Sequence, residues 1–192
     1  MTGHMADVVL ARALVRGGAP DQVGIVVENL DEALVRYSTL WPSLGEWRCY
    51  TYSPETVRRL EFDGVLSSYA MKIALASASP QMELIEPIAG PNIYQEWLEK
   101  HGKGIHHIGL YVESLGAELK RLRDTGVRVI QSGFGFGLDG DGGFAYLDTV
   151  CQLGFFVELI ELPARRRPPE KVWPAAQQGH SRIENAIGTK ET

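Results

Sequence analysis

Two stretches of the chain carry the same order of apolar and polar positions. Residues 22–27 form an apolar, β-branched run that predicts a strand, and apolar residues recur at helical spacing over residues 30–37. Residues 107–112 and 115–122 repeat this order of strand and amphipathic helix. Each pair is followed by three runs typical of strands, first at 47–52, 69–76 and 81–87 and then at 127–133, 142–149 and 154–163.

The two stretches also align residue by residue. QVGIVVENLDEAL matches HIGLYVESLGAEL, which places Gln22 on His107, and MELIEP matches VELIELP, which places Glu83 on Glu158. A repeat with only two copies does not build a solenoid array. We therefore predict an α+β fold in which two tandem βαβββ modules pack around one sheet.

Breaks in the pattern divide the chain into five segments. Pro91 and Asn92 can start a helix and Gly102 can end it, so this helix connects the two modules. After residue 163 the chain becomes rich in proline and charge, and we expect a wrapped or disordered tail. The segments are an N-terminal extension (1–19), a first module (20–90), the connector helix (91–104), a second module (105–163) and a C-terminal tail (164–192).

Composition excludes some classes of function. The 192 residues include 44% hydrophobic residues and carry a net charge of −5, which is typical of a globular domain and argues against a nucleic-acid partner. No apolar run approaches the ~20 residues that a membrane helix needs. We therefore expect a cytoplasmic protein with a small-molecule substrate and no membrane partner.

Four polar side chains interrupt strands that otherwise suit a core. Alternate residues of a strand share a face, so Gln22, Glu83, His107 and Glu158 occupy equivalent places on four strands of the duplicated pattern. Buried charges are rarely left unpaired. A divalent cation bound by all four side chains would balance their negative charge, and we predict such a site.

Neighbouring polar residues fit simpler roles. His106 should face away from His107, and Glu86 and Glu161 should lie on the surface. The glycine-rich stretch 133–143 has a formal GxGxxG pattern, but strands flank it, so we interpret it as a hairpin loop and not a nucleotide site. Two further groups are candidate substrate contacts: the aromatic residues Phe134, Phe136 and Phe144 for an apolar pocket, and the basic run Arg165, Arg166 and Arg167 for an acidic substrate.

The chain resembles the vicinal oxygen chelate superfamily over residues 20–163. The resemblance rests on DQVGIVVENLDEAL, MELIEP, GKGIHHIGLYVESL, RLRDTGVRVI and FVELIELP, and it is strongest to methylmalonyl-CoA epimerase-like members. It implies that Gln22, Glu83, His107 and Glu158 bind Zn, Ni, Co or Mn. It also implies that the two βαβββ modules form a curved mixed sheet around a central metal cleft. The other expectations from the resemblance are a homodimer and a carbonyl or acyl-CoA-like substrate.

The chain departs from that family pattern at two places. Gln22 stands where the family has its first histidine, and the set Gln, Glu, His, Glu also occurs in some zinc glyoxalase I enzymes. Bacterial epimerases carry another catalytic glutamate on the strand before the second ligand, whereas this chain offers only Tyr69 and Lys72 there. The second departure argues against methylmalonyl-CoA itself as the substrate.

A site of this kind favours proton abstraction next to a metal-bound carbonyl, through an enolate. Glu158 is the best candidate for the base, and Glu83 faces the substrate from the other side. We therefore expect an isomerase, epimerase or racemase. Two alternatives stay open: a glyoxalase I-type lyase acting on a hemithioacetal, and a metal-free resistance protein that binds a drug. An oxygenase fits less well, because Gln22 removes one histidine from the iron-binding set.

Overall fold

A computed structural model describes residues 19–174 of the chain, apart from the side chain of Asp124. The proposed segments 1–19 and 164–192 therefore lie largely outside the described residues, and the module boundaries stay a prediction. The helices and strands, in chain order, are β1 Gln22–Val26, α2 Leu30–Leu40, β2 Trp47–Tyr52, β3 Arg59–Phe62, β4 Val65–Leu66, β5 Ala70–Ala76, β6 Gln81–Ala89, α3 Ile93–His101, β7 Gly104–Tyr111, α4 Leu115–Leu122, β8 Val129–Phe134, β9 Gly143–Leu147, α5 Val150–Leu153, β10 Phe156–Glu161 and β11 Lys171–Trp173.

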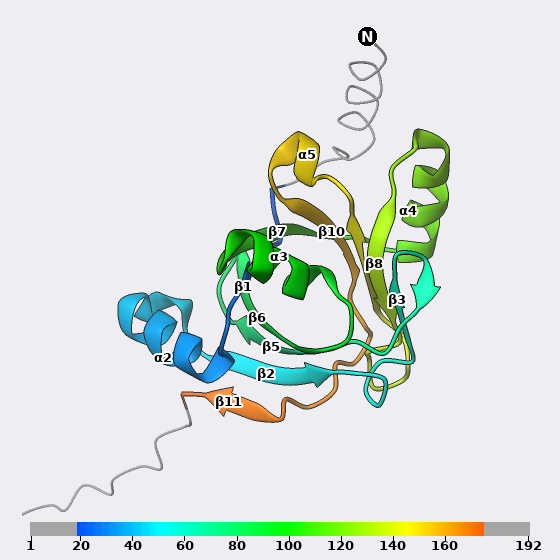
Figure 1. The fold of residues 1–192 in the computed structure, drawn as a ribbon. Helices are drawn as coiled ribbons and strands as arrows, with labels where there is room; N and C mark the ends of the chain where they lie inside the picture. Colours follow the sequence, from blue (N-terminus) through cyan, green and yellow to red (C-terminus); the bar gives the residue numbers. More distant parts are fainter. Residues whose placement is uncertain (1–18, 175–192) are drawn as a thin grey trace, which may run out of the picture.

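The described strands form one curved, unclosed sheet (Figure 1). Its order is β11-β2-β5-β6-β1-β7-β10-β9-β8-β3-β4. At its centre β1 and β7 pair antiparallel and join the two repeats, while β1 pairs parallel with β6 and β7 pairs parallel with β10. The expectation of an α+β fold with a curved mixed sheet is confirmed. The four strands that carry the candidate ligands, β6, β1, β7 and β10, are neighbours at its middle.

Of the three longer helices, two lie on the outer face of this sheet and one lies inside its curve (Figure 1). Helix α2 packs on the outer face of β1, β2, β5 and β6, and α4 packs on the outer face of β9 and β10. Helix α3 lies inside the curve, where Ile93 and Tyr94 join the core of the concave face. Strand alternation explains this division, because Ile73 belongs to the inner core and its neighbour Ala74 to the core beneath α2.

Two glutamates expected on the surface instead bind helix termini. Both Glu86 and Glu161 are half-buried. Oε2 of Glu86 accepts a hydrogen bond of 2.8 Å from the backbone N–H of Leu30 at the start of α2. Oε2 of Glu161 accepts one of 2.7 Å from Leu115 at the start of α4. A helix N-terminus has free N–H groups and favours negative charge, which accounts for both residues. The equivalence of the two contacts also supports the duplication.

Three short strands lie outside the repeated pattern. β3 and β4 follow a turn at residues 53–57, and they extend the far edge of the sheet beside β8. β11 pairs with β2 at the opposite edge, so part of the expected tail is ordered against the sheet.

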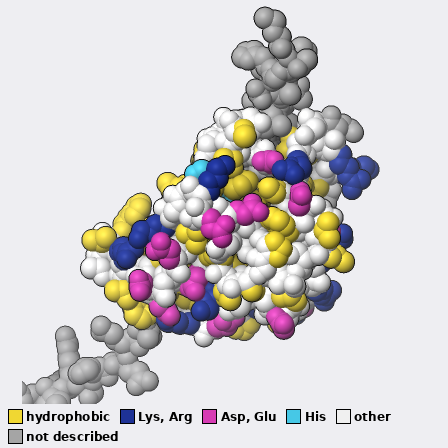
Figure 2. Space-filling view, viewed as in Figure 1, with side chains coloured by type: hydrophobic (Ala, Val, Ile, Leu, Met, Phe, Trp, Pro, Cys, Tyr) yellow, Lys and Arg dark blue, Asp and Glu magenta, His cyan; other side chains and the backbone are white. Residues whose placement is uncertain are grey.

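Within residues 19–174 no helix is long and apolar enough to cross a membrane. Acidic and basic side chains are interspersed on the face drawn in Figure 2.

Candidate metal centre

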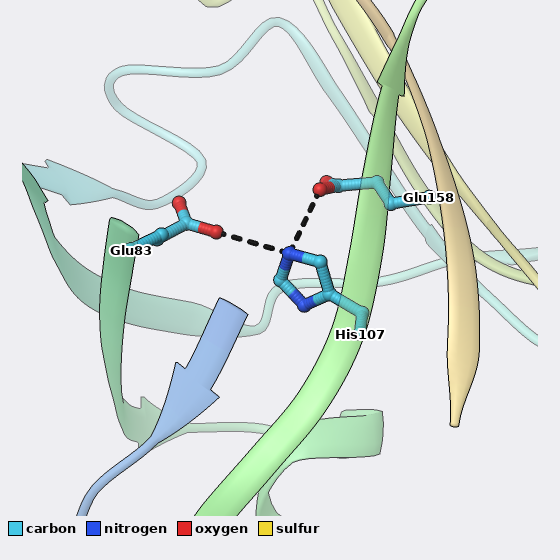
Figure 3. Close-up of side chains that lie close together, drawn as sticks. All are labelled: Glu83, His107 and Glu158. Carbon is cyan, nitrogen blue, oxygen red and sulfur yellow. Dashed lines mark ion pairs between the residues drawn. The ribbon is translucent and has the colours of Figure 1, made fainter. Parts of the chain in front are cut away.

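Three buried side chains converge on one point of the concave face (Figure 3). Glu83 extends from β6, His107 from β7 and Glu158 from β10. Nε2 of His107 lies 3.1 Å from Oε2 of Glu158 and 3.3 Å from Oε2 of Glu83. The internal repeat predicts all three residues, and β7 is adjacent to β10 and separated from β6 by β1.

Gln22 completes the group of four that the repeat predicts. Its Oε1 lies 3.5 Å from Nε2 of His107. Its Nε2 donates a hydrogen bond of 3.1 Å to Oε1 of Gln81, which orients the amide so that its oxygen faces the cluster. Gln81 was not identified from the sequence, because an amide near a strand end carries no signal of this kind.

The cluster has unbalanced charge when only protein groups are counted. Burial alone lowers the pKa of His107, but the carboxylates of Glu158 and Glu83 outweigh this effect and raise its pKa to about 9. Burial raises the pKa of Glu83, and the hydrogen bond with His107 and the more distant charge of Arg166 act in the opposite direction. One imidazolium therefore faces two carboxylates in a buried space.

The hydrogen bonds of the cluster are also incomplete. The same atoms, Oε2 of Glu83 and Oε2 of Glu158, are buried and have no other donor among the described residues. Nε2 of His107 carries at most one proton, so it cannot satisfy both oxygens. Ligands about 2.1 Å from one ion are themselves roughly 3.0–3.4 Å apart, which matches these separations. The donor set and its spacing therefore fit a divalent cation.

The second ring nitrogen of His107 contacts His106. Their Nδ1 atoms lie 3.1 Å apart, so the expectation that His106 faces away is wrong. The pairing of β1 with β7 shifts register between Gly24 and Ile25, and this bulge leaves His106 without a partner on β1. Burial lowers the pKa of His106 well below its usual range, so it is a neutral ring that can orient His107.

A small cavity of about 30 Å³ opens beside the cluster. Of the aromatic residues proposed for a pocket, Phe136 and Phe144 line it, whereas Phe134 packs in the core beneath α4. Its full lining is Gln22, Tyr52, Ile73, Leu75, Glu83, Phe136, Phe144, Glu158, Ile160 and Arg166.

Tyr69 and Lys72 are the two residues at β5 that the sequence suggested as a base, and neither faces this cavity. Lys72 is exposed, and the buried hydroxyl of Tyr69 donates a hydrogen bond of 2.8 Å to the backbone oxygen of Ser132. The inward residues of β5 at the cavity are Ile73 and Leu75. The wall where bacterial epimerases are expected to place another glutamate is therefore aliphatic.

Comparison with known sequences agrees with the fold. The family model of the Glyoxalase/Bleomycin resistance protein/Dioxygenase superfamily matches residues 21–146. An uncharacterized Bacillus subtilis (strain 168) protein, YqjC, is 33% identical over 87 residues, which cover 44% of this chain and 60% of that protein. The match therefore spans less than two thirds of this relative.

Solved structures show the same architecture at low sequence identity. Methylmalonyl-CoA epimerase from Mycobacterium tuberculosis is 22% identical with a TM-score of 0.54, over 79% of this chain and 95% of that one. A Streptomyces coelicolor methylmalonyl-CoA epimerase variant in complex with 2-nitronate-propionyl-CoA is 24% identical with a TM-score of 0.53, over 76% and 97%. A hypothetical protein, BH1468, from Bacillus halodurans C-125 is 21% identical with a TM-score of 0.52, over 78% and 97%. The chain belongs to the glyoxalase/bleomycin resistance/dioxygenase superfamily, the vicinal oxygen chelate proteins.

Proposed function

We propose that this protein is a metal-dependent isomerase, epimerase or racemase that removes a proton next to a carbonyl group. The observation that carries the proposal is the convergence of Glu83 and Glu158 on Nε2 of His107, with the amide oxygen of Gln22 beside it. These four side chains would hold the ion. A bound divalent cation supplies Lewis-acid polarisation of the carbonyl, which stabilises the enolate that forms.

The carboxylates of the site perform the proton transfer. Glu158 and Glu83 both line the cavity, so either can reach a carbon atom held there. Glu158 acts as the base that accepts the substrate proton and returns it to the same or a neighbouring carbon, while Glu83 faces the substrate from β6.

The aliphatic wall of β5 limits the choice of base. Ile73 and Leu75 occupy its positions at the cavity, so no group from this strand can act as an acid or base. This observation separates the chain from the epimerase pattern and favours substrates other than methylmalonyl-CoA. A mechanism in which only the ligand carboxylates move protons is equally compatible with the alternative, a glyoxalase I-type lyase acting on a hemithioacetal.

Metal analysis and hydrogen exchange test the proposal together. The purified protein should contain about one Zn, Ni, Co or Mn per chain, bound with the affinity of a resident ion. With that ion it should exchange solvent deuterium into the carbon next to the carbonyl of at least one member of a panel of 2-substituted acyl-CoAs, α-chiral ketones and hydroxyaldehydes. Conversion of a methylglyoxal–glutathione hemithioacetal instead would identify the lyase.

A matched pair of histidine variants gives the control. His107→Gln should lose both the metal and the exchange, because it removes the imidazole at the centre of the cluster. His101→Gln alters an exposed histidine on α3 and should keep both. A wild-type protein that stays free of metal after incubation with each ion, yet binds apolar drugs, would support the binding-module alternative and overturn the proposal.

A further inference from the structure

Arg166 lies beside the candidate metal centre although it belongs to the segment after β10. Its side chain lines the cavity that also contains Glu83 and Glu158. The residue falls outside the stretch 21–146 that matches the superfamily. A contact between its backbone and that of Gly137 holds it against the loop between β8 and β9.

The guanidinium of Arg166 has few protein partners. Its Nη1 donates a hydrogen bond of 3.0 Å to the hydroxyl of Tyr52, and its Cζ lies 5.6 Å and 5.3 Å from the ring centroids of Tyr50 and Phe136. Among residues 19–174 it forms no ion pair, whereas the adjacent Arg165 pairs with Asp139. Arginine can donate five hydrogen bonds, so most of its donors remain available.

Arg166 also lines a second small cavity. This cavity has a volume of about 40 Å³ and shares Tyr52, Phe136 and Arg166 as walls with the first. Arg167 lines the second cavity, where its Nε is buried without a hydrogen-bond partner among the described residues. Glu170 lies there too, but its carboxylate already accepts hydrogen bonds from the backbone and hydroxyl of Thr51.

The balance of charge indicates what this guanidinium binds. Two carboxylates offset one divalent cation, so with an ion on Glu83 and Glu158 the positive charge of Arg166 remains without a counter-ion at the cavity. A guanidinium placed over aromatic rings with free donors is well suited to a carboxylate, which it can bind through two parallel hydrogen bonds. The negative charge that balances Arg166 would then come from the substrate.

We propose that Arg166 binds an anionic carboxylate of the substrate, and that the substrate enters between Tyr52, Phe136 and Arg166 so that the two cavities become one. This inference rests on the proposed function, and it narrows the substrate to carbonyl compounds that carry a carboxylate near the reacting carbon. Arg166 is a specificity-determining residue in this scheme, and the proton transfers remain with the glutamates.

Binding of malonate and of its neutral analogue malonamide tests the inference by calorimetry on the protein as purified with its metal. Wild-type protein should prefer malonate, and Arg166→Gln should lower malonate affinity about tenfold or more while malonamide affinity stays within about twofold. Arg166→Lys keeps the positive charge but lacks the planar guanidinium, so its affinity for malonate should lie between those of wild type and Arg166→Gln. Arg165→Gln removes the neighbouring arginine, which pairs with Asp139 outside both cavities, and should bind both probes as wild type does.

The outcomes separate this inference from the proposed function. Malonate affinity that is equal in wild type and Arg166→Gln, with unchanged melting temperature, would overturn the role of Arg166 even if deuterium exchange proceeds normally. Arg166-dependent malonate binding in a protein that shows no exchange with any carbonyl compound would retain the anion site and remove the epimerase. Equal loss of malonate and malonamide binding in Arg166→Gln would mean that the side chain only supports the cavity wall, and it would also overturn the inference.

Discussion

His107 and Gly24 lie opposite one another on β7 and β1, and the imidazole ring fills the space in which a side chain of residue 24 would stand. A Cβ atom at Gly24 would lie 1.8 Å from the ring carbon Cε1. The same relationship recurs between Gln22 and Gly109, where an added Cβ would lie 2.9 Å from Cβ of Gln22. Each repeat thus supplies a candidate ligand and, two residues later, the glycine that makes room for the ligand of the other repeat.

Gly24→Ala should therefore displace His107 and abolish metal binding. The overlap is far below any van der Waals contact, so the ring must move, and we expect a loss of about 1–3 kcal/mol in the free energy of unfolding together with the lost ion. Metal content and denaturant unfolding measure the two effects. Gly116→Ala in helix α4, where an added Cβ meets nothing within 4 Å, is the matched control and should bind metal normally. A metal-replete Gly24→Ala protein would contradict the assigned packing.

Glu158→Gln should stop turnover and leave weak metal binding. The amide keeps one oxygen near Nε2 of His107 but cannot accept a proton, so kcat for deuterium exchange should fall at least about a hundredfold. Exchange kinetics and metal titration measure the two effects separately. Glu99→Gln, on the exposed side of α3, should leave both unchanged. A rate equal to that of wild type in Glu158→Gln would remove Glu158 from the role of base.

His106→Phe should weaken metal binding without unfolding the protein. The ring at this position packs against Tyr94, Trp97 and Phe156, with centroid distances of 5.2, 5.2 and 4.9 Å, so phenylalanine can retain the packing. It removes the nitrogen that contacts Nδ1 of His107, and partners of this kind typically contribute about 10–100-fold in metal affinity. Competition with a chelating dye measures the affinity. An affinity within twofold of wild type, with native melting behaviour, would show that His106 is only a core residue.

The metal-free protein should lose stability as the pH rises from about 6.5 to about 9. The folded-state pKa of His107 is raised from 6.5 to about 9, so its proton stabilises the folded state fully below pH 6.5 and progressively less up to pH 9. The contribution is up to about 3 kcal/mol. Denaturant unfolding of chelator-treated protein across this range measures it. His101→Gln should keep this pH dependence. If the free energy of unfolding of His107→Gln changes with pH as steeply as that of wild type, the prediction is contradicted.

The repeated pattern was sufficient to predict the sheet and the central cluster. Strand alternation and the two aligned segments predict that Gln22 and Glu83 lie beside His107 and Glu158, because equivalent positions of a duplicated module face a common axis. The caps Asn29 and Ser114 also follow from local sequence, since each side chain accepts a hydrogen bond from its own helix.

Features that depend on contacts between distant segments could not be predicted from the sequence. The side-chain direction of His106 depends on a bulge that arises only when β7 pairs with β1. Glu86 and Glu161 bind helix termini that lie far from them along the chain. Arg166 reaches the cavity because the segment after β10 crosses the loop between β8 and β9, and a run of three arginines reveals nothing about that crossing.

The centre draws equally on the two repeats, since Gln22 and Glu83 come from the first and His107 and Glu158 from the second. A polypeptide that has been synthesised only as far as α3 contains half of these groups and cannot gather them. An ion held by these four groups would therefore bind only after the second repeat has been synthesised, and a truncated product would carry neither the charge cluster nor any chemistry that depends on it.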